Sequence, residues 1–500
     1  VISWSRDVKM DDNSKGMDNN RSIASSSQSV LCEDYRVYRW RWFILFVICI
    51  LNFSNAMIWI TFSPIADSTI VFFKIDSLRL NMLSLVYLIA SIPFGFIASW
   101  LLDTLGLRTS IIMSAWLNAV GSVLRNISTI DSIIPQSASY PVLLTGQILA
   151  ACAQPFAMFA PTKVAALWFP GTQRATANML ASMANPLGIL AANVIAPAVV
   201  STPGDLPLAL WVMTGPAVVT VLLATFGICS SVPPTPPTSS AAEESEPFFK
   251  GLKQIVRNKN YWILNFCFGT GLAIFTALSS FFDQILCPRG YSDTFAGICG
   301  AIMIAAGALG AVIAGLYVDR SKKFEEVVKV CFACAVLFGI MFTEVSRFRD
   351  QQVLIALSAA LFGGFGFAIY PISMELAVEV TYPVAEATSA GLAIISGQFQ
   401  GVIYMFLMQF IAQPLPDNEK NLPTGCATDN ASANGFTPQD WTVPNLVLNG
   451  IGTFSVVLLL LGFKATYRRL LSEQKAKADK IMNISSEIVF SDSGISPTSL

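Results

Sequence analysis

Long apolar segments alternate with short polar stretches along most of the chain. Twelve of the segments are about 20 residues long, which is the length an α-helix needs to cross the hydrocarbon core of a bilayer. The pattern predicts an all-α membrane protein with twelve transmembrane helices, at residues 42–66, 81–102, 109–127, 141–162, 175–198, 207–231, 261–286, 295–318, 327–346, 352–378, 387–412 and 442–466.

One polar stretch, 232–260, is longer than the other internal ones and leaves six apolar segments on each side. Its prolines, the last of them Pro247, disfavour helix and sheet hydrogen bonds, and its charged residues favour water. The arrangement predicts two six-helix bundles, 42–231 and 261–466, joined by this linker. A tail at 1–41, rich in Ser, Asn and Asp, is expected to be disordered, and a second tail covers 467–500.

The basic residues predict how the chain is oriented in the membrane. Of the 31 Lys and Arg residues, 24 fall on the side that both tails and the linker share, and 7 fall on the other side. Cytosolic segments carry an excess of Lys and Arg. Both termini and the linker are therefore expected in the cytosol. The protein itself is expected in the plasma membrane or, as the alternative, in an organelle membrane.

Composition excludes several classes of function. Apolar residues make up 54% of the chain and charged residues 13%, whereas a soluble domain carries about 25% charge. There is no histidine, which rules out histidine metal ligands, histidine ligation of haem and His-dependent triads. With no nucleotide loop or metal-ligand cluster either, we expect neither an enzyme nor a bound cofactor. The basic residues form no patch, so nucleic acid is not an expected partner.

Two short motifs occur once in each half, at nearly the same spacing. D-T-L-G-L-R, with Asp103, follows the second segment of the first half, and G-L-Y-V-D-R, with Asp319, follows the second segment of the other half. The motifs W-F-P-G-T and T-Y-P-V-A, each after a fourth segment, form the second pair. These echoes predict duplicated halves, and parallel repeats of this kind with a site between them are a transporter architecture.

The Asp–Gly–Arg turn predicts a gate on the cytosolic side. Gly106 would let the turn adopt a positive φ, Asp103 would lie at a helix N-terminus, and Arg108 would pair with a carboxylate of a neighbouring helix. Asp319 and Arg320 would form the second copy. The alternative is that these charges only decorate the cytosolic loops.

Glu375 and Glu379 lie one helical turn apart near the expected cytosolic end of the tenth segment. Like charges at that spacing repel, so each is expected to have a basic partner. Lys163 and Arg174, at the corresponding place in the other half, are the candidates. The alternative is that both carboxylates reach cytosolic water.

Polar residues inside the apolar segments are candidates for a solute site, because hydrocarbon offers them no partners. Most are amides rather than charges, which favours a polar or cationic solute over an anion. Each amide could instead form a helix–helix hydrogen bond that only adds packing specificity. The candidates are Asn52, Asn55, Trp59, Gln147, Gln154, Asn185, Asn193, Asp283, Gln284, Gln398, Gln400 and Gln409.

Residues 36 to 470 resemble a known family. The twelve segments, the central linker and D-x-x-G-x-R resemble the major facilitator superfamily. The first segment, R-W-F-I-L-F-V-I-C-I-L-N-F-S-N-A-M-I-W-I-T-F-S-P-I-A-D, together with G-Q-I-L-A-A-C-A-Q and M-E-L-A-V-E-V-T-Y-P, is similar to solute carrier family 49. That family contains the feline leukaemia virus subgroup C receptor-related transporters.

The resemblance implies a secondary transporter and a set of solute contacts. In one branch of the family choline or ethanolamine sits in a cage of one Trp and one Tyr, lined by amides. Trp59 matches the cage Trp, and the positions that match lining amides are Gln154, Asn185 and Gln398. The cage Tyr falls on Thr276, with Phe275 beside it, so half of the cage is lost or replaced.

An amine-like cation is the favoured substrate. The alternatives are a haem or other metabolite transporter of the same family, and a membrane receptor or scaffold without flux.

Three further expectations concern the loops and the tail. Cys287 and Cys426 fall in loops expected outside the cell, where a disulfide between them would persist, and the alternative is two free thiols. Asn430, in Asn-Ala-Ser, is an expected glycosylation site. The last residues, Thr498 to Leu500, could add a strand to a PDZ-type groove of a partner. We otherwise expect a monomer.

Overall fold

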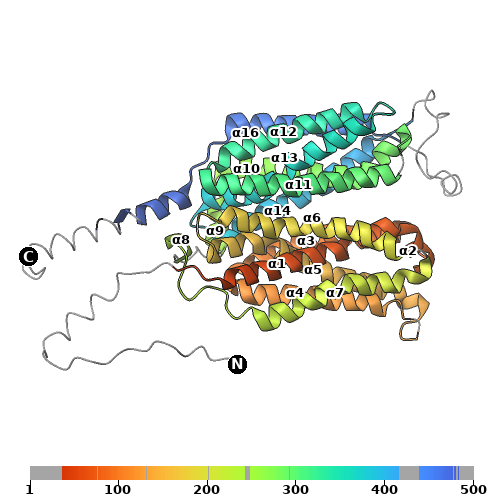
Figure 1. Cartoon of the computed structure of the whole chain (residues 1–500), viewed down its shortest axis with the longest axis horizontal. Coiled ribbons are helices and arrows are strands. Elements are labelled where there is room, and N and C mark those ends of the chain that lie inside the picture. The colour runs from red at the N-terminus through yellow and green to blue at the C-terminus, as the bar shows by residue number, and fades with distance from the viewer. Residues whose placement is uncertain are drawn as a thin grey trace, which may run out of the picture.

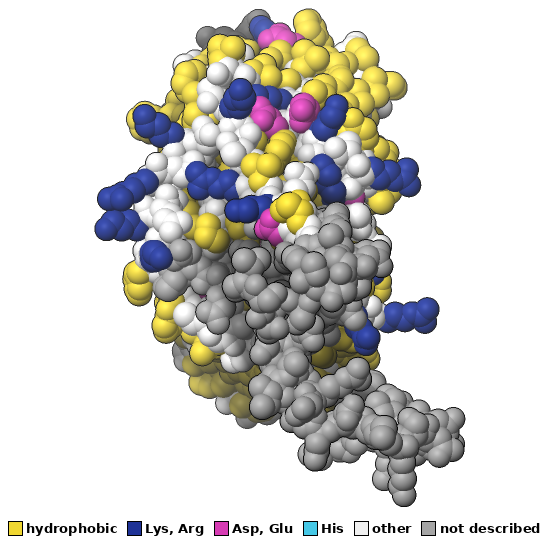
Figure 2. All heavy atoms as spheres, turned by 90° about the vertical axis from the view of Figure 1, so that its left-hand side faces the viewer, with side chains coloured by type: hydrophobic (Ala, Val, Ile, Leu, Met, Phe, Trp, Pro, Cys, Tyr) yellow, Lys and Arg dark blue, Asp and Glu magenta, His cyan; other side chains and the backbone are white. Residues whose placement is uncertain are grey.

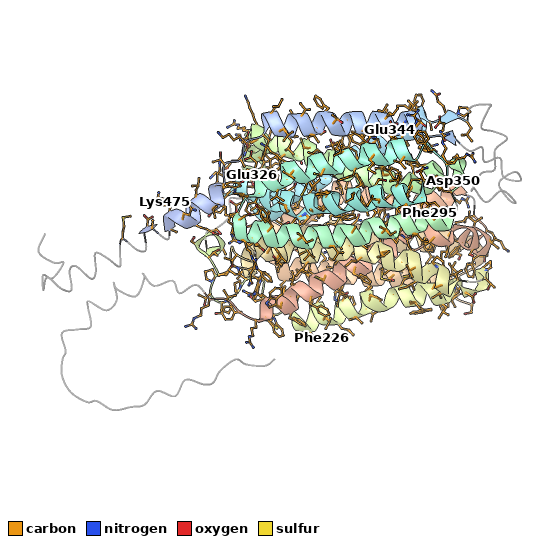
Figure 3. The ribbon with its side chains drawn as sticks, turned by 45° about the horizontal axis from the view of Figure 1, so that its top comes forward. Phe226, Phe295, Glu326, Glu344, Asp350 and Lys475 are labelled. Atoms are coloured by element: carbon orange, nitrogen blue, oxygen red, sulfur yellow. The ribbon has the colours of Figure 1, made fainter. Side chains whose placement is uncertain are left out.

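The chain folds into two helical bundles that lie side by side (Figure 1). The computed structural model describes residues 36–75, 77–130, 132–200, 202–242, 248–291, 293–415, 439–476, 478–479 and 482. We call the end of the molecule where α1 begins and α16 ends the tail side, and the opposite end the loop side. Figure 3 marks both ends, with Glu326 and Lys475 at the tail side and Glu344 and Asp350 at the loop side.

The first bundle contains seven helices of six residues or more, six of them long. A short helix, α2, follows the first long one. Their bounds are α1 (Trp40–Ile60), α2 (Ala66–Phe73), α3 (Ser77–Thr104), α4 (Gly106–Ile127), α5 (Gln136–Trp168), α6 (Arg174–Val199) and α7 (Leu206–Gly227).

The second bundle contains six long helices: α10 (Lys259–Leu286), α11 (Asp293–Ser321), α12 (Phe324–Val345), α13 (Gln352–Thr381), α14 (Glu386–Ile411) and α16 (Thr442–Gly462). Two two-residue strands, β1 (Gln413–Pro414) and β2 (Gln439–Asp440), pair antiparallel on the loop side. Across the described residues, twelve helices are long and apolar enough to span a bilayer. The predicted fold class and the number of spans are therefore confirmed.

The linker differs from its prediction, because part of it is helical. The proline-rich part, 231–238, has no helix, as expected. Two helices follow it, α8 (Ser239–Ala242) and the ten-residue α9 (Phe248–Arg257). Helix α9 begins after Pro247, the last proline of the linker, so nothing in its sequence blocks the backbone hydrogen bonds.

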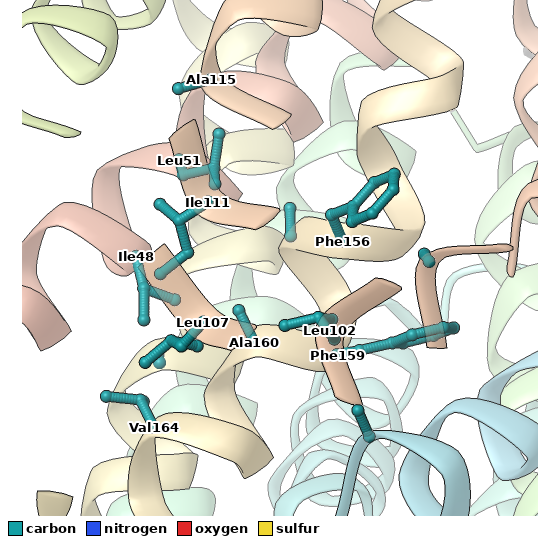
Figure 4. Packing of buried hydrophobic residues seen from close by; sticks show 14 of the residues in the cluster. Ile48, Leu51, Leu102, Leu107, Ile111, Ala115, Phe156, Phe159, Ala160 and Val164 are labelled. Carbon is teal, nitrogen blue, oxygen red and sulfur yellow. The ribbon is translucent and has the colours of Figure 1, made fainter. Parts of the chain in front are cut away.

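The core of the first bundle is built from side chains of all six of its long helices. Ile48 and Leu51 of α1, Leu102 of α3, and residues of α4 and α5 such as Ile111 and Phe156 interdigitate in it (Figure 4). The outer faces of the helices carry large apolar side chains, for example Phe410 and Phe226, that are more than three-quarters exposed. Because hydrocarbon is as apolar as these side chains, a bilayer accounts for that exposure.

The two bundles meet along two seams, where α3 packs on α14 and α6 packs on α11. Inside the bundles, glycines allow helices to approach closely. A Cβ at Gly310 of α11 would overlap the backbone carbonyl of Gly364 of α13, and a Cβ at Gly363 would overlap that of Met303. Small residues at such crossings replace the hydrophobic driving force that membranes lack.

We expect Gly310→Ala to lower the yield of folded protein, because the added methyl meets a backbone carbonyl that cannot move without separating α11 from α13. The control is Gly300→Ala on the same helix, where a Cβ would have open space within 4 Å. Size-exclusion chromatography of the detergent-solubilised variants measures the monodisperse fraction. Equal yields for both variants would contradict the close crossing.

Candidate functional site

A cavity of about 120 Å³ lies between the bundles, lined by α1, α5 and α6 of the first and by α10, α12, α13 and α16 of the second. An apolar cavity of about 150 Å³ in another protein holds a benzene molecule, so the space suits a small organic molecule. No lining residue is charged. Six aromatic side chains line the cavity: Phe268, Phe275, Phe332, Phe362, Phe367 and Tyr370.

Some polar side chains on the cavity wall already form hydrogen bonds within the protein. Asn52 donates to the carbonyl oxygens of Ile48 and Ala157, and Ser182 donates to the Asn178 side chain. Asn185 and Tyr370 differ, because neither side chain forms a hydrogen bond with any part of the chain that the structure describes. Their amide and hydroxyl are therefore available to a solute.

The structure brings together only part of the predicted solute set. Asn185 and Phe275 line the cavity, and the Phe275 ring lies edge-on to Phe367 at 4.6 Å. Thr276, the next residue, does not line the cavity. Its hydroxyl donates a hydrogen bond to the Leu272 carbonyl oxygen of the same helix at 2.9 Å. Gln398 is half-buried on α14 and lies outside the cavity lining.

Trp59 and Gln154 form a separate group against one face of α3. The Trp59 indole N–H donates to the Ser84 carbonyl oxygen at 3.3 Å, and the ring lies 6.4 Å from that of Tyr87. Gln154 accepts a hydrogen bond from the Ser91 hydroxyl at 2.6 Å. Both side chains thus have partners inside the first bundle, and neither lines the cavity.

Arg125 is a buried charge that the sequence interpretation missed. Its guanidinium is 1% exposed, donates to the Ile58 carbonyl oxygen at 3.0 Å and lies 4.8 Å over the Phe62 ring. Gln147 donates to the carbonyl oxygens of Ile58 and Trp59. A positive charge is stabilised at a helix C-terminus, so Arg125 holds the end of α1 that carries Trp59.

A signal for Arg125 was present in the sequence. Asn118, Ser122 and Arg125 are spaced by four and three residues, so they share one face of a helix. All three are buried in the bundle. A polar stripe of this kind within an apolar segment marks an inward face.

On the tail side, Asp103 reaches from the end of α3 to the second bundle. Its carboxylate accepts hydrogen bonds from the backbone N–H and the hydroxyl of Thr388, in the first turn of α14, at 3.0 and 2.6 Å. The Lys163 ammonium lies between Asp103, at 3.0 Å, and Glu386, at 2.9 Å. Three buried charges therefore join the bundles at this seam.

Asp319 makes the equivalent contact in the opposite direction. From the end of α11 its carboxylate accepts from the backbone N–H groups of Ala175 and Thr176, in the first turn of α6, at 3.0 and 2.7 Å. Each repeated aspartate thus caps a helix of the other bundle. A carboxylate is stabilised there by the free N–H groups and by the helix dipole.

The arginines of the repeated turn do not behave as predicted. Arg108 donates to the carbonyl oxygen of Ile228 at 2.8 Å, beyond the end of α7, rather than to a carboxylate. The carbonyls at a helix C-terminus carry partial negative charge and lie within its reach. Arg320 is exposed. Gly106 has the expected positive φ, +83°, whereas the positive φ of the second copy is at Lys322, +57°.

Neither predicted partner of Glu375 and Glu379 forms a direct ion pair with them among the described residues, although Arg174 interacts with both carboxylates electrostatically. Lys163 binds Asp103 and Glu386, as described, and Arg174 pairs with Glu473 at 2.8 Å. The carboxylates do not reach water either, since the two residues are 1% and 5% exposed.

The two glutamates contact both α6 and the C-terminal tail. The Asn178 amide of α6 donates to the Glu375 carboxylate at 3.2 Å. Arg469 is 4.0 Å from Glu375, and the Leu470 backbone N–H donates to Glu379 at 3.1 Å. Residues 468–476 are helical. The tail thus returns under the bundles, which apolar patterning could not indicate.

The tail and the linker form one buried network with α6. Arg174 donates to the Thr238 and Ser240 hydroxyls at 2.6 and 3.0 Å, and Arg469 donates to Ser240 at 3.3 Å. Burial lowers the pKa of Arg469, but four surrounding glutamates outweigh this and raise it above its usual value. Burial raises the pKa of Glu473, but Arg174, Ser240 and Arg469 outweigh this and lower it. Both groups are therefore held charged.

Several predicted features lie outside the described residues. They are the Cys287 side chain, Cys426, Asn430 and residues Thr498 to Leu500. The disulfide, the glycosylation site and the PDZ-type contact stay predictions.

Sequence comparison identifies relatives along most of the chain. Residues 44–405 match the profile of the Major Facilitator Superfamily. The chain is 49% identical over 459 residues to "Solute carrier family 49 member A3" of Xenopus tropicalis, covering 91% of this chain and 93% of the relative. It is 27% identical over 421 residues to "Choline/ethanolamine transporter flvcr2b" of Danio rerio, covering 79% and 85%.

Comparison with solved structures shows the same fold. The chain matches the major facilitator transporter FucP in the outward conformation with a TM-score of 0.61. The match covers 84% of this chain and 99% of FucP at 14% sequence identity.

We expect Lys163→Met to destabilise the protein by about 3 kcal/mol or more, because it leaves two buried carboxylates without their cation. Thermal unfolding followed by tryptophan fluorescence measures the change. The matched control is Arg347→Met, which breaks an ion pair with Glu344 whose side chains are 47% and 46% exposed and should cost less than about 1 kcal/mol. Equal losses for the two variants would rule out a structural role for the Lys163 contacts.

Proposed function

The chain belongs to the major facilitator superfamily, and within it to solute carrier family 49, and from this premise we propose that it is a secondary transporter of a small organic solute. The solute binds between the two bundles, and the protein works by alternating access. The bundles touch along two seams, so rocking one bundle against the other exposes the cavity to either side in turn.

The observation that carries the proposed substrate class is the chemistry of the cavity wall. Six aromatic rings and no charged residue line it. An anion would lack a cationic partner there, whereas an ammonium group gains cation–π attraction from aromatic faces. A choline- or amine-like cation therefore fits best, which agrees with the name of the flvcr2b relative.

In this proposal Tyr370 replaces the cage tyrosine, whose position in this chain is occupied by Thr276. Its ring lies 5.6 Å from Phe268 on the cavity wall, and its hydroxyl has no hydrogen-bond partner among the described residues. Phe275 and Tyr370 would contact the ammonium head, and the Asn185 amide would orient the polar end of the solute. Trp59, at the loop-side end of α1, stays a candidate for an outer contact on the way in.

The tail-side contacts are the proposed gate. Asp103 and Asp319 cap helices of the opposite bundle, and the turn around Gly106 and Arg108 fixes where Asp103 lies. Opening toward this side, which the basic residues predict to be cytosolic, requires these contacts and the Lys163–Glu386 pair to break. The buried network around Arg174, Glu375 and Glu379 would open with them.

The test is uptake of labelled choline and ethanolamine into proteoliposomes by matched amounts of protein. Tyr370→Ala should weaken binding by roughly 30-fold, because a desolvated cation–π contact contributes about 2 kcal/mol. Tyr370→Phe keeps the ring and should weaken it less. Tyr317→Ala, which removes a half-exposed tyrosine of α11, is the control.

Trp59→Ala separates the outer position from the cavity. If the ammonium head rests on Trp59, this variant should lose as much as Tyr370→Ala, and if it rests in the cavity the loss should be smaller. Unchanged uptake in both variants would contradict a site in which an aromatic ring contacts the ammonium group. An absence of uptake for every small amine tried would contradict the substrate class.

A second variant addresses the position of the missing tyrosine. Thr276→Tyr should strengthen recognition of choline if its ring can reach the cavity beside Phe275. A loss of stability with no change in selectivity would show that Thr276 only packs.

A further inference from the structure

Helix α9 of the linker has three different faces. Gly251 and Ile255 are buried against the protein, and a Cβ at Gly251 would lie 2.8 Å from the Val384 side chain. Phe249 and Val256, two turns apart on one adjoining face, are 76% and 55% exposed. The remaining face is basic. A helix divided in this way is typical of the membrane interface.

Three basic residues of this segment form no ion pair in the described part of the chain. Lys253 and Arg257 lie one turn apart on α9, Lys259 follows at the start of α10, and all three are exposed and outside every ion pair found there. Figure 2, which looks at the tail side, shows that Lys and Arg outnumber Asp and Glu on this surface. Three cations on one short segment that have no ion-pair partner among the described residues favour binding of an anion.

The position of α9 next to a transmembrane helix indicates that the anion is a lipid phosphate. The transmembrane helix α10 begins two residues after α9 ends, and the Trp262 indole N–H donates to the Val256 carbonyl oxygen at 2.9 Å. Trp262 is itself half-exposed, as interfacial tryptophans are. The exposed Phe249 and Val256 therefore lie at the depth where the bilayer begins, and the basic face lies at the level of lipid phosphates.

The helix also touches the seam between the bundles. It packs against α3, α10 and α14, and Asn258, directly after it, donates to the Val380 carbonyl oxygen of α13 at 3.1 Å. Val384, against which Gly251 packs, lies two residues before Glu386, the partner of Lys163. Whatever binds α9 is thus joined to the tail-side contacts.

We propose that α9 is a binding site for anionic phospholipid of the tail-side leaflet. Lys253, Arg257 and Lys259 bind the headgroup, and Phe249 and Val256 insert among the upper acyl chains. Bound lipid holds α9 against the loop between α13 and α14 and stabilises the arrangement in which the tail side is closed. The site does not depend on which solute is carried.

The test uses the full-length protein in detergent, with phosphatidylserine as the probe and phosphatidylcholine as the neutral comparison. Native mass spectrometry gives the apparent affinity for each lipid, and thermal unfolding gives the stabilisation. Phosphatidylserine should bind in preference and raise the unfolding temperature. Lys253→Gln with Arg257→Gln should weaken its binding by roughly 30-fold, from the attraction of each basic residue to an anionic surface.

A matched control removes the same charge elsewhere. Lys323→Gln with Lys475→Gln removes two exposed lysines of the tail side that lie outside α9, and should leave the affinity unchanged. Equal weakening in both double variants would overturn the site, since only net charge would matter.

Phe249→Ser with Val256→Ser tests insertion. These changes should weaken the binding of phosphatidylserine. They should not weaken the binding of glycerophosphoserine, which has the headgroup without acyl chains. Stabilisation by glycerophosphoserine or inorganic phosphate equal to that by the lipid would show a site for soluble anions and contradict the proposal.

Discussion

The contacts between the bundles on the tail side depend on two aspartates that each cap a helix of the opposite bundle. Asp103 accepts two hydrogen bonds from Thr388 in the first turn of α14, and Asp319 accepts from the backbone of α6. The first N–H groups of a helix have no partner within it, so a carboxylate satisfies them and the helix dipole at once. Because these hydrogen bonds join different bundles, they break when the bundles separate on the tail side.

Charge is distributed unevenly along the interface between the bundles. The tail-side end holds Lys163, Arg174 and Arg469 among buried carboxylates, with several contacts between 2.8 and 4.0 Å. The cavity has no charged side chain at all. Removing one member of a buried charge pair is costly, so the tail-side charges favour one discrete arrangement. For the cationic solute that we propose, the neutral cavity leaves its charge to be met by aromatic faces.

The linker and the C-terminal tail are part of this interface rather than simple connections. Ser240 of the linker lies between Arg174 and Arg469, and Glu473 neutralises part of their charge. Helix α9 packs on the loop that leads to Glu386. Segments that contain little apolar sequence are thus held by charge-assisted hydrogen bonds, which are about twice as strong as neutral ones.

The sequence by itself determined the twelve spans, because a 20-residue apolar run has few other solutions in a bilayer. It also identified Asp103 and Asp319 as equivalent, since the repeat places them after the same helix of each half. It could not determine which way a helix is rotated. Thr276 and Phe275 are neighbours, yet only the phenylalanine faces the cavity, and Tyr370 enters it from another helix. Partners such as Glu375 and Arg469 are 94 residues apart along the chain and meet only when the tail folds under the bundles. Rotation and long-range pairing are set by packing between helices, and only the tertiary structure contains that information.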